Sequence, residues 1–161
     1  GTSKNKIYVN GFMLRLDVPN DKRNTLDWHQ DSPYYQMTYP KFNAGVCWVS
    51  ITNNSAKNGS LTFLPKSHNK FSFTKLNKKS KYSSGQFRIP VSNKNEKLAE
   101  NLNSKSRDID VLHMLIKHKS GINTSKKIRI NLGCRFHSMD DKFNSGDEVF
   151  IFNKTDKTIL I

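Results

Sequence analysis

The chain has 161 residues, which is enough for one ordinary domain and leaves little room for a second. Hydrophobic residues make up 35% of the chain, too many for full disorder, and no apolar run approaches the roughly 18 residues that cross a bilayer, so disordered and transmembrane classes are excluded. Lys and Arg number 27 against 13 Asp and Glu, and the net charge of +14 favours either an anionic partner or a compositional bias toward lysine.

Short apolar runs separated by turn residues dominate the chain, and no long run shows the 3.6-residue period of a helix. Turn dipeptides such as Asn10-Gly11 and Ser145-Gly146 separate these runs. The pattern predicts an all-β sandwich or barrel with few short helices. The predicted strands are, in chain order, Ile7–Val9, Phe12–Leu16, Val46–Thr52, Leu61–Leu64, Val111–His118, Lys127–Leu132, Glu148–Asn153 and Thr158–Ile161.

Residues 66–107 interrupt this rhythm, because they are rich in Lys, Ser and Asn and hold few apolar residues. Their length predicts a basic loop or lid insert within one domain that spans residues 1–161. The best helix candidate, Asn95–Asn103, lies in this insert. The lysine-rich run from Lys75 to Lys81 is expected to be either a solvated loop or a basic rim that attracts an anionic substrate.

The first candidate site lies in the segment Asp27-Trp28-His29-Gln30-Asp31. Residues two apart on an extended backbone point to the same face, so His29 and Asp31 would present an imidazole and a carboxylate side by side. These are two of the three ligands of a facial 2-His-1-carboxylate iron site. A His-x-Asp pair alone is weak evidence, because surface pairs of this kind are common.

Two later segments add to the pattern. One reads Asn58-Gly-Ser-Leu-Thr-Phe-Leu-Pro-Lys-Ser-His68, and in the other an apolar run ends at His118-Lys-Ser-Gly-Ile-Asn123-Thr-Ser125. Arg129 follows on the next predicted strand, eleven residues after His118. Taken alone, His118 is more readily explained as a strand-end histidine bonded to the backbone, and its place eleven residues before Arg129 reverses that preference.

Together the three segments resemble the phytanoyl-CoA dioxygenase family of non-haem Fe(II), 2-oxoglutarate-dependent oxygenases, in the same order and over about residues 14–136. The resemblance implies a double-stranded β-helix, the cupin-like jelly roll. It also implies that His29, Asp31 and His118 are the iron ligands and that Arg129 pairs with the far carboxylate of 2-oxoglutarate.

Two further residues are candidates for binding the cosubstrate. Trp48 shares strand parity with Val46 and Ser50, on a strand that could line the pocket, and Ser120 belongs to the matched turn. The chemistry agrees with the resemblance, because three protein ligands leave open positions on Fe(II), and an arginine fork matches a carboxylate in bidentate geometry.

The sequence departs from the family pattern in several places. Lys66 and Arg107 stand at turn positions where the family usually has glycine. Only 28 residues precede His29, so the family's helical N-terminal region is expected to be missing. If Arg129 faces the interior, Ile128, Ile130 and Leu132 face outward, and we expect another element, such as a partner subunit, to cover them.

The implied function is oxidation of a small, anionic organic substrate with Fe(II), 2-oxoglutarate and O2. Related halogenases replace the carboxylate ligand with a small residue, so the presence of Asp31 implies hydroxylation or another oxidation.

The alternatives are a non-catalytic basic β-barrel that binds nucleic acid or another polyanion, and a degenerate family member without activity. Nucleic acid is the less favoured partner, because no aromatic interleaving accompanies the basic run. Cys47 and Cys134 form no disulfide framework and no signal segment is visible, so we expect a cytoplasmic location and no membrane association.

Overall fold

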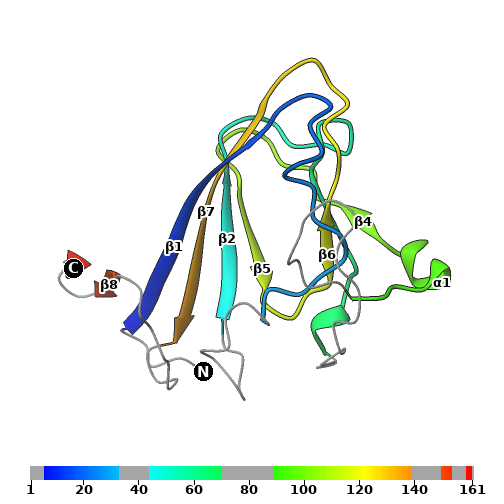
Figure 1. Ribbon diagram of the computed structural model, residues 1–161. Helices are drawn as coiled ribbons and strands as arrows, with labels where there is room; N and C mark the ends of the chain where they lie inside the picture. Colours follow the sequence, from blue (N-terminus) through cyan, green and yellow to red (C-terminus); the bar gives the residue numbers. More distant parts are fainter. Residues whose placement is uncertain (1–5, 33–43, 70–88, 139–149, 154–158, 161) are drawn as a thin grey trace.

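The computed structural model consists of two antiparallel sheets that lie opposite one another (Figure 1). It describes residues 6–32, 44–69, 89–138, 150–153 and 159–160. The strands are β1 (Lys6–Asp17), β2 (Ala44–Ser50), β3 (Leu61–Phe63), β4 (Glu100–Asn101), β5 (Ile109–His113), β6 (His118–Ser120), β7 (Arg129–Ser138), β8 (Phe150–Asn153) and β9 (Ile159–Leu160). The helical elements of the described residues are the 3-10 turn η3 (Ser67–Asn69) and the short helix α1 (Asn93–Glu96). The all-β prediction with few short helices is confirmed.

The larger sheet has the strand order β5-β2-β7-β1-β8-β9, and the smaller has the order β4-β3-β6. Side chains alternate between the two faces of each strand of the larger sheet. On β7 the inward residues Arg129 and Asn131 are buried, whereas Leu132 is exposed. The predicted facing of this strand is therefore correct, and polar side chains point between the sheets.

The first strand is longer than predicted, because Ile7–Val9 and Phe12–Leu16 belong to one strand, β1. The register against β7 shifts between Asn10 and Met13, which marks a bulge. Gly11 lies in this bulge with φ of +61°, a backbone conformation that glycine adopts without strain. The Asn-Gly signal thus marks an irregularity inside a strand rather than a turn between two strands.

Two other predictions differ from the structure. The predicted strand Val111–His118 is broken into β5 and β6, because residues 114–117 form a connecting turn. The predicted helix Asn95–Asn103 is wrong: α1 ends at Glu96, and the chain then pairs with β3 as β4. Pairing with an existing strand outweighs the weak helix preference of a short polar segment.

The apolar core between the sheets is small. Leu61, Leu112 and Ile116 form its buried cluster, with Trp48, Phe63 and Leu102 packed against them. Much of the remaining buried volume is polar, including histidine, aspartate, asparagine and arginine side chains. Buried polar groups are costly unless they are partnered, so an interior of this kind indicates a binding site.

The outer face of the larger sheet is apolar and exposed. Phe12, Leu14 and Leu132 are 62%, 61% and 45% accessible to solvent, and they line a shallow hollow with Met13, Val49, Gly133 and Cys134. Within the described ranges, no helix is long and apolar enough to span a membrane.

Lys66 and Arg107, which stand where the family that the sequence resembles usually has glycine, both have left-handed backbone conformations. Lys66 has φ of 60° and Arg107 has φ of 79°. A side chain at such a position is strained by about 1 kcal/mol or more relative to glycine. Both residues thus have a backbone conformation that glycine would adopt without strain.

We therefore expect Arg107→Gly to stabilise the protein by about 1 kcal/mol, equivalent to a rise in Tm of about 3 °C for a chain of this size. Thermal unfolding of the two proteins measures this difference. Lys117→Gly, at a position with an ordinary φ, is the control and should lower the Tm. A lower Tm for Arg107→Gly would contradict the claim that the backbone at Arg107 is strained.

Candidate metal centre

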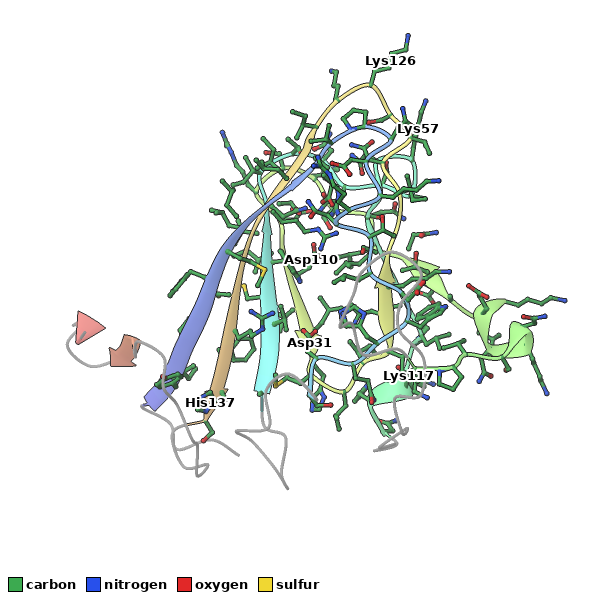
Figure 2. All side chains as sticks on the ribbon, in the orientation of Figure 1. Asp31, Lys57, Asp110, Lys117, Lys126 and His137 are labelled. Atoms are coloured by element: carbon green, nitrogen blue, oxygen red, sulfur yellow. The ribbon has the colours of Figure 1, made fainter. Side chains whose placement is uncertain are left out.

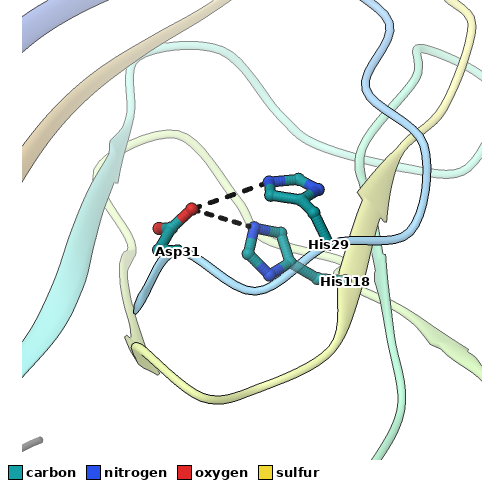
Figure 3. Close-up of side chains that lie close together, drawn as sticks. All are labelled: His29, Asp31 and His118. Atoms are coloured by element: carbon teal, nitrogen blue, oxygen red, sulfur yellow. Dashed lines mark ion pairs between the residues drawn. The ribbon is translucent and has the colours of Figure 1, made fainter. Parts of the chain in front are cut away.

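Two histidines that lie far apart in the sequence face each other across a backbone bridge. The amide of His29 donates to the carbonyl of His118 at 2.9 Å, and the amide of His118 donates to the carbonyl of His29 at 3.0 Å. Their rings lie 4.2 Å apart between centroids. His118 begins β6, so the segment of His29 extends the smaller sheet by one bridge (Figure 3).

Asp31 completes the cluster. Its Oδ1 lies 3.6 Å from Nε2 of His29 and 3.9 Å from Nε2 of His118, as Figure 3 shows. The amide of Asp31 donates to the carbonyl of Met114, and the side chain of Gln30 donates to the carbonyl of Leu115. These bonds hold the His29–Asp31 segment against the turn between β5 and β6. All three residues are buried, and one potential ligand atom from each lies within 4.8 Å of the others.

The backbone sets the protonation of the two rings. Nδ1 of His29 lies 2.7 Å from the carbonyl oxygen of Asp27, and Nδ1 of His118 lies 3.0 Å from that of Ile116. A carbonyl can only accept, so each Nδ1 carries a proton, and the neutral ring presents its Nε2 lone pair toward Asp31. Two lone pairs and a carboxylate that face one another in a buried site repel unless a cation lies between them.

The pKa values of the cluster suit a cation. Burial alone raises the pKa of Asp31, but its interactions with His29, His118 and Arg135 lower it to about 2. Burial, together with the proximity of the His29 imidazole, lowers the pKa of His118 to about 4. At neutral pH the cluster therefore offers an ionised carboxylate and an unprotonated His118, the forms that bind metal.

The lowered pKa of His118 predicts how the stability of the metal-free protein depends on pH. In the unfolded chain this histidine has its ordinary pKa of 6.5, whereas in the folded protein it takes a proton only near pH 4. The unfolded state binds more protons between these values, so the free energy of unfolding falls as the pH drops from about 7 to 4, by on the order of 3 kcal/mol at most. Urea unfolding at pH 7 and pH 5 measures this loss, and His118→Gln should reduce it. An equal loss in both proteins would contradict this origin.

A pocket between the sheets contains two of the three predicted cosubstrate residues. Arg129 and Trp48 both line it, together with five others: Arg15, Asn54, Leu61, Leu102 and Asn131. Gly133 lies opposite Trp48 on β7, and a Cβ there would come within 2.7 Å of the indole ring. Glycine at this position therefore makes room for the indole.

None of the three cluster residues lines this pocket, and an electrostatic interaction links it to them. Arg15 is a wall of the pocket, and its charge contributes to lowering the pKa of His118. Figure 2 shows Asp31 between the two sheets, with Lys57 and Lys126 in loops toward the other end of the molecule.

The third predicted cosubstrate residue, Ser120, does not line this pocket. Its hydroxyl accepts a hydrogen bond from the amide of Leu26 at 2.7 Å and lies 3.5 Å from the carbonyl of Asn24. It thus holds the segment that leads to His29, and its cosubstrate role stays a prediction. His113 is exposed, and its ring stands 5.3 Å from that of His68, outside the cluster of His29 and His118.

Sequence reasoning missed Arg15 and Asp17. Asp17 is the register partner of Arg129, and its Oδ2 accepts a hydrogen bond from Nη2 of Arg129 at 2.6 Å. Arg15 bonds the same carboxylate through Nε, at 3.1 and 3.0 Å. The available signal was the alternation of Arg15 and Asp17 with Leu14 and Leu16, which places both charged residues on one face of β1.

The residues present fit a metal ion and a carboxylate ligand. Two imidazoles and one carboxylate on one face are the donor set that non-haem Fe(II) takes in oxygenases, with positions left open for other ligands. Nε of Arg129 is buried and has no hydrogen-bond partner among the described residues, so one donor of a buried cation is available to an anion.

Comparison with solved structures places the fold. The non-heme monooxygenase ThoJ in its apo form superposes with a TM-score of 0.69 at 18% identity, covering 97% of this chain and 56% of ThoJ. The epimerase SnoN from nogalamycin biosynthesis, in complex with Fe3+, alpha ketoglutarate and nogalamycin RO, superposes with a TM-score of 0.66 at 13% identity. The match covers 87% of this chain and 53% of SnoN. EctD from S. alaskensis with bound Fe superposes with a TM-score of 0.64 at 16% identity, and the match covers 87% of this chain and 48% of EctD.

This chain therefore spans about half the length of each of these three proteins. The likeness confirms the predicted double-stranded β-helix, because all three align over most of this chain. The search of curated proteins found no match to the sequence of this chain. The sequence of residues 6–131 matches the phytanoyl-CoA dioxygenase family, and this stretch includes every predicted site residue. The chain belongs to the phytanoyl-CoA dioxygenase family.

Proposed function

We propose that the protein is an Fe(II)- and 2-oxoglutarate-dependent dioxygenase of the hydroxylase type, with a small, anionic organic substrate. The observation that carries this proposal is the buried cluster of His29, Asp31 and His118, whose ligand atoms face one another. Family membership supports it, and so does the pocket that Arg129 and Trp48 line between the two sheets.

In this proposal each residue has a distinct task. Nε2 of His29, Nε2 of His118 and the carboxylate of Asp31 hold Fe(II), and Arg129 binds the far carboxylate of 2-oxoglutarate. Bound Fe(II) and the keto acid together supply the chemistry that activates O2 for oxidation of the substrate. Trp48 packs along the cosubstrate chain, and the sheets around the pocket exclude water from it.

The anionic character of the substrate is proposed from the net charge of +14. The predicted basic rim, Lys75 to Lys81, lies outside the described residues. We also propose a partner subunit over the exposed outer face, because Phe12 and Leu14 are each more than 60% accessible there. Sedimentation velocity would show this as an oligomer. The free thiols of Cys47 and Cys134 support a reducing, cytoplasmic location.

The direct test is turnover. The protein reconstituted anaerobically with Fe(II) is exposed to O2 and 2-oxoglutarate with a panel of anionic small molecules, and succinate formation and O2 consumption are measured. We expect succinate that depends on Fe(II), disappears with chelator, and is lost in Asp31→Ala but not in Asp21→Ala. Asp21 is the control because its ion pair with Arg23 is exposed.

Two outcomes would contradict the proposal. Tight Fe(II) binding without succinate from any member of the panel would indicate a degenerate family member. Binding of a polyanion that falls steeply with salt and survives Asp31→Ala would indicate the non-catalytic basic barrel.

A further inference from the structure

Asp17 is a buried carboxylate that touches the arginine expected to bind the cosubstrate. It is only 7% exposed and lies directly opposite Arg129 at the end of the β1–β7 ladder. Its Oδ2 accepts from Nη2 of Arg129 at 2.6 Å. Its backbone carbonyl accepts from the side chain of Asn123 at 2.7 Å, so the position of the carboxylate is held from behind as well.

Asp17 also holds a second arginine. Nε of Arg15 donates to both carboxylate oxygens, at 3.1 and 3.0 Å, and Nη2 of Arg15 donates to the carbonyl of Asn24 at 2.6 Å. Both oxygens of Asp17 are thus engaged, one of them by two guanidinium groups. Among the described residues, a single carboxylate pairs with both arginines, so one of their two positive charges is left for a ligand beside the pocket that both arginines line. This charge suits one carboxylate group of a ligand.

The contact with Asp17 also determines which nitrogen of the Arg129 guanidinium can donate a hydrogen bond to a ligand. Nη2 is taken by Asp17, whereas Nε has no hydrogen-bond partner among the described residues, although the side chain is only 3% exposed. A guanidinium group is planar, so fixing one nitrogen and the plane also fixes the direction of the Nε–H bond. An unpartnered buried donor costs free energy, which a bound carboxylate would recover.

We propose that Asp17 is a positioning residue that orients the guanidinium of Arg129 and thereby sets a preference for 2-oxo acids with a second carboxylate. The inference rests on the proposed function, since it takes Arg129 as the binding group for that carboxylate. Asp17 lies outside the cluster of His29, Asp31 and His118, and it acts through Arg129.

Asp17→Asn tests this role, because the amide removes the negative charge and replaces one acceptor oxygen with an NH2 donor that cannot accept from a guanidinium group. Protein loaded with Ni(II), which does not turn over, is titrated by calorimetry with 2-oxoglutarate and with 2-oxopentanoate. The second ligand has the same chain length and carries a methyl group in place of the far carboxylate. The matched control is Asp21→Asn, which removes an exposed carboxylate bonded to Arg23.

We expect wild-type protein to prefer 2-oxoglutarate by at least tenfold. Asp17→Asn should lower the affinity for 2-oxoglutarate at least tenfold and leave that for 2-oxopentanoate within twofold, with Ni(II) affinity unchanged and no effect of Asp21→Asn. A purely structural role would instead weaken both ligands equally, and either that result or an unchanged preference would overturn the proposal.

The same titrations distinguish failure of the proposed function from failure of the proposed role of Asp17. A wild-type protein that binds neither keto acid, or does not distinguish them, would contradict the proposed function and this inference together, whereas a retained preference in Asp17→Asn would contradict only the inference. If Asp17→Asn does not fold, Asp17→Glu keeps the charge and displaces it by one methylene. The same selective loss of 2-oxoglutarate affinity is then expected, and its absence would overturn the proposal.

Discussion

Replacing His118 by alanine is expected to lower the affinity of the protein for Fe(II) by at least a hundredfold and to abolish 2-oxoglutarate turnover. His118 presents its Nε2 lone pair toward Asp31 from a ring that the carbonyl of Ile116 holds in place. Loss of a partner that only orients a ligand costs roughly 10- to 100-fold in metal affinity, so loss of the ligand itself should cost more. Anaerobic calorimetric titration with Fe(II) measures the change.

The control for this variant is His113→Ala. His113 ends β5 and is exposed, and its Nδ1 accepts a hydrogen bond from the amide of Leu115. We expect this substitution to leave Fe(II) affinity within a few-fold of wild type. His118→Gln preserves more of the buried volume and guards against loss of folding. Undiminished Fe(II) binding in a folded His118 variant would remove this residue from the ligand set.

The second large effect is expected at Arg129. Arg129→Gln should weaken binding of 2-oxoglutarate by roughly a hundredfold, because truncating one partner of a buried, hydrogen-bonded charge pair costs about 3 kcal/mol. Affinity for Fe(II) should change little, since Arg129 is no member of the ligand cluster. Titration of the Ni(II)-loaded protein with 2-oxoglutarate separates the two effects.

Arg129→Lys refines this prediction. Lysine retains the positive charge but not the planar fork, so it should recover part of the affinity and leave Asp17 with a cationic neighbour. Arg23→Gln is the control, because the ion pair of Arg23 with Asp21 is exposed and its loss should leave binding unchanged. Equal affinity of wild type and Arg129→Gln for 2-oxoglutarate would exclude Arg129 as the carboxylate-binding residue.

Local patterns in the sequence predicted the parts of the site that lie close together along the chain. His29 and Asp31 share a face because they are two residues apart on extended backbone, and the structure brings them together. The facing of Arg129 and Asn131 followed from the same alternation along β7. The approach of His118 to His29 depends on a bridge between distant segments, and only the family resemblance indicated it.

Contacts set by strand register could not be read from the sequence. The pairing of Asp17 with Arg129 joins residues 112 positions apart and follows from the β1–β7 register, which the bulge near Gly11 shifts. The helix predicted over Asn95–Asn103 failed for a similar reason, since a partner strand was available at β3. Backbone strain was partly visible, because Lys66 and Arg107 stood where glycine is usual and both have positive φ.

The most direct test of the central claim is diffraction from crystals grown anaerobically with Fe(II) and 2-oxoglutarate, measured with anomalous scattering at the iron absorption edge. We predict one iron peak bonded to Nε2 of His29, Nε2 of His118 and a carboxylate oxygen of Asp31, with the keto acid reaching from the ion to Arg129. An iron peak elsewhere, or three side chains that bind no ion in iron-saturated crystals, would contradict the account.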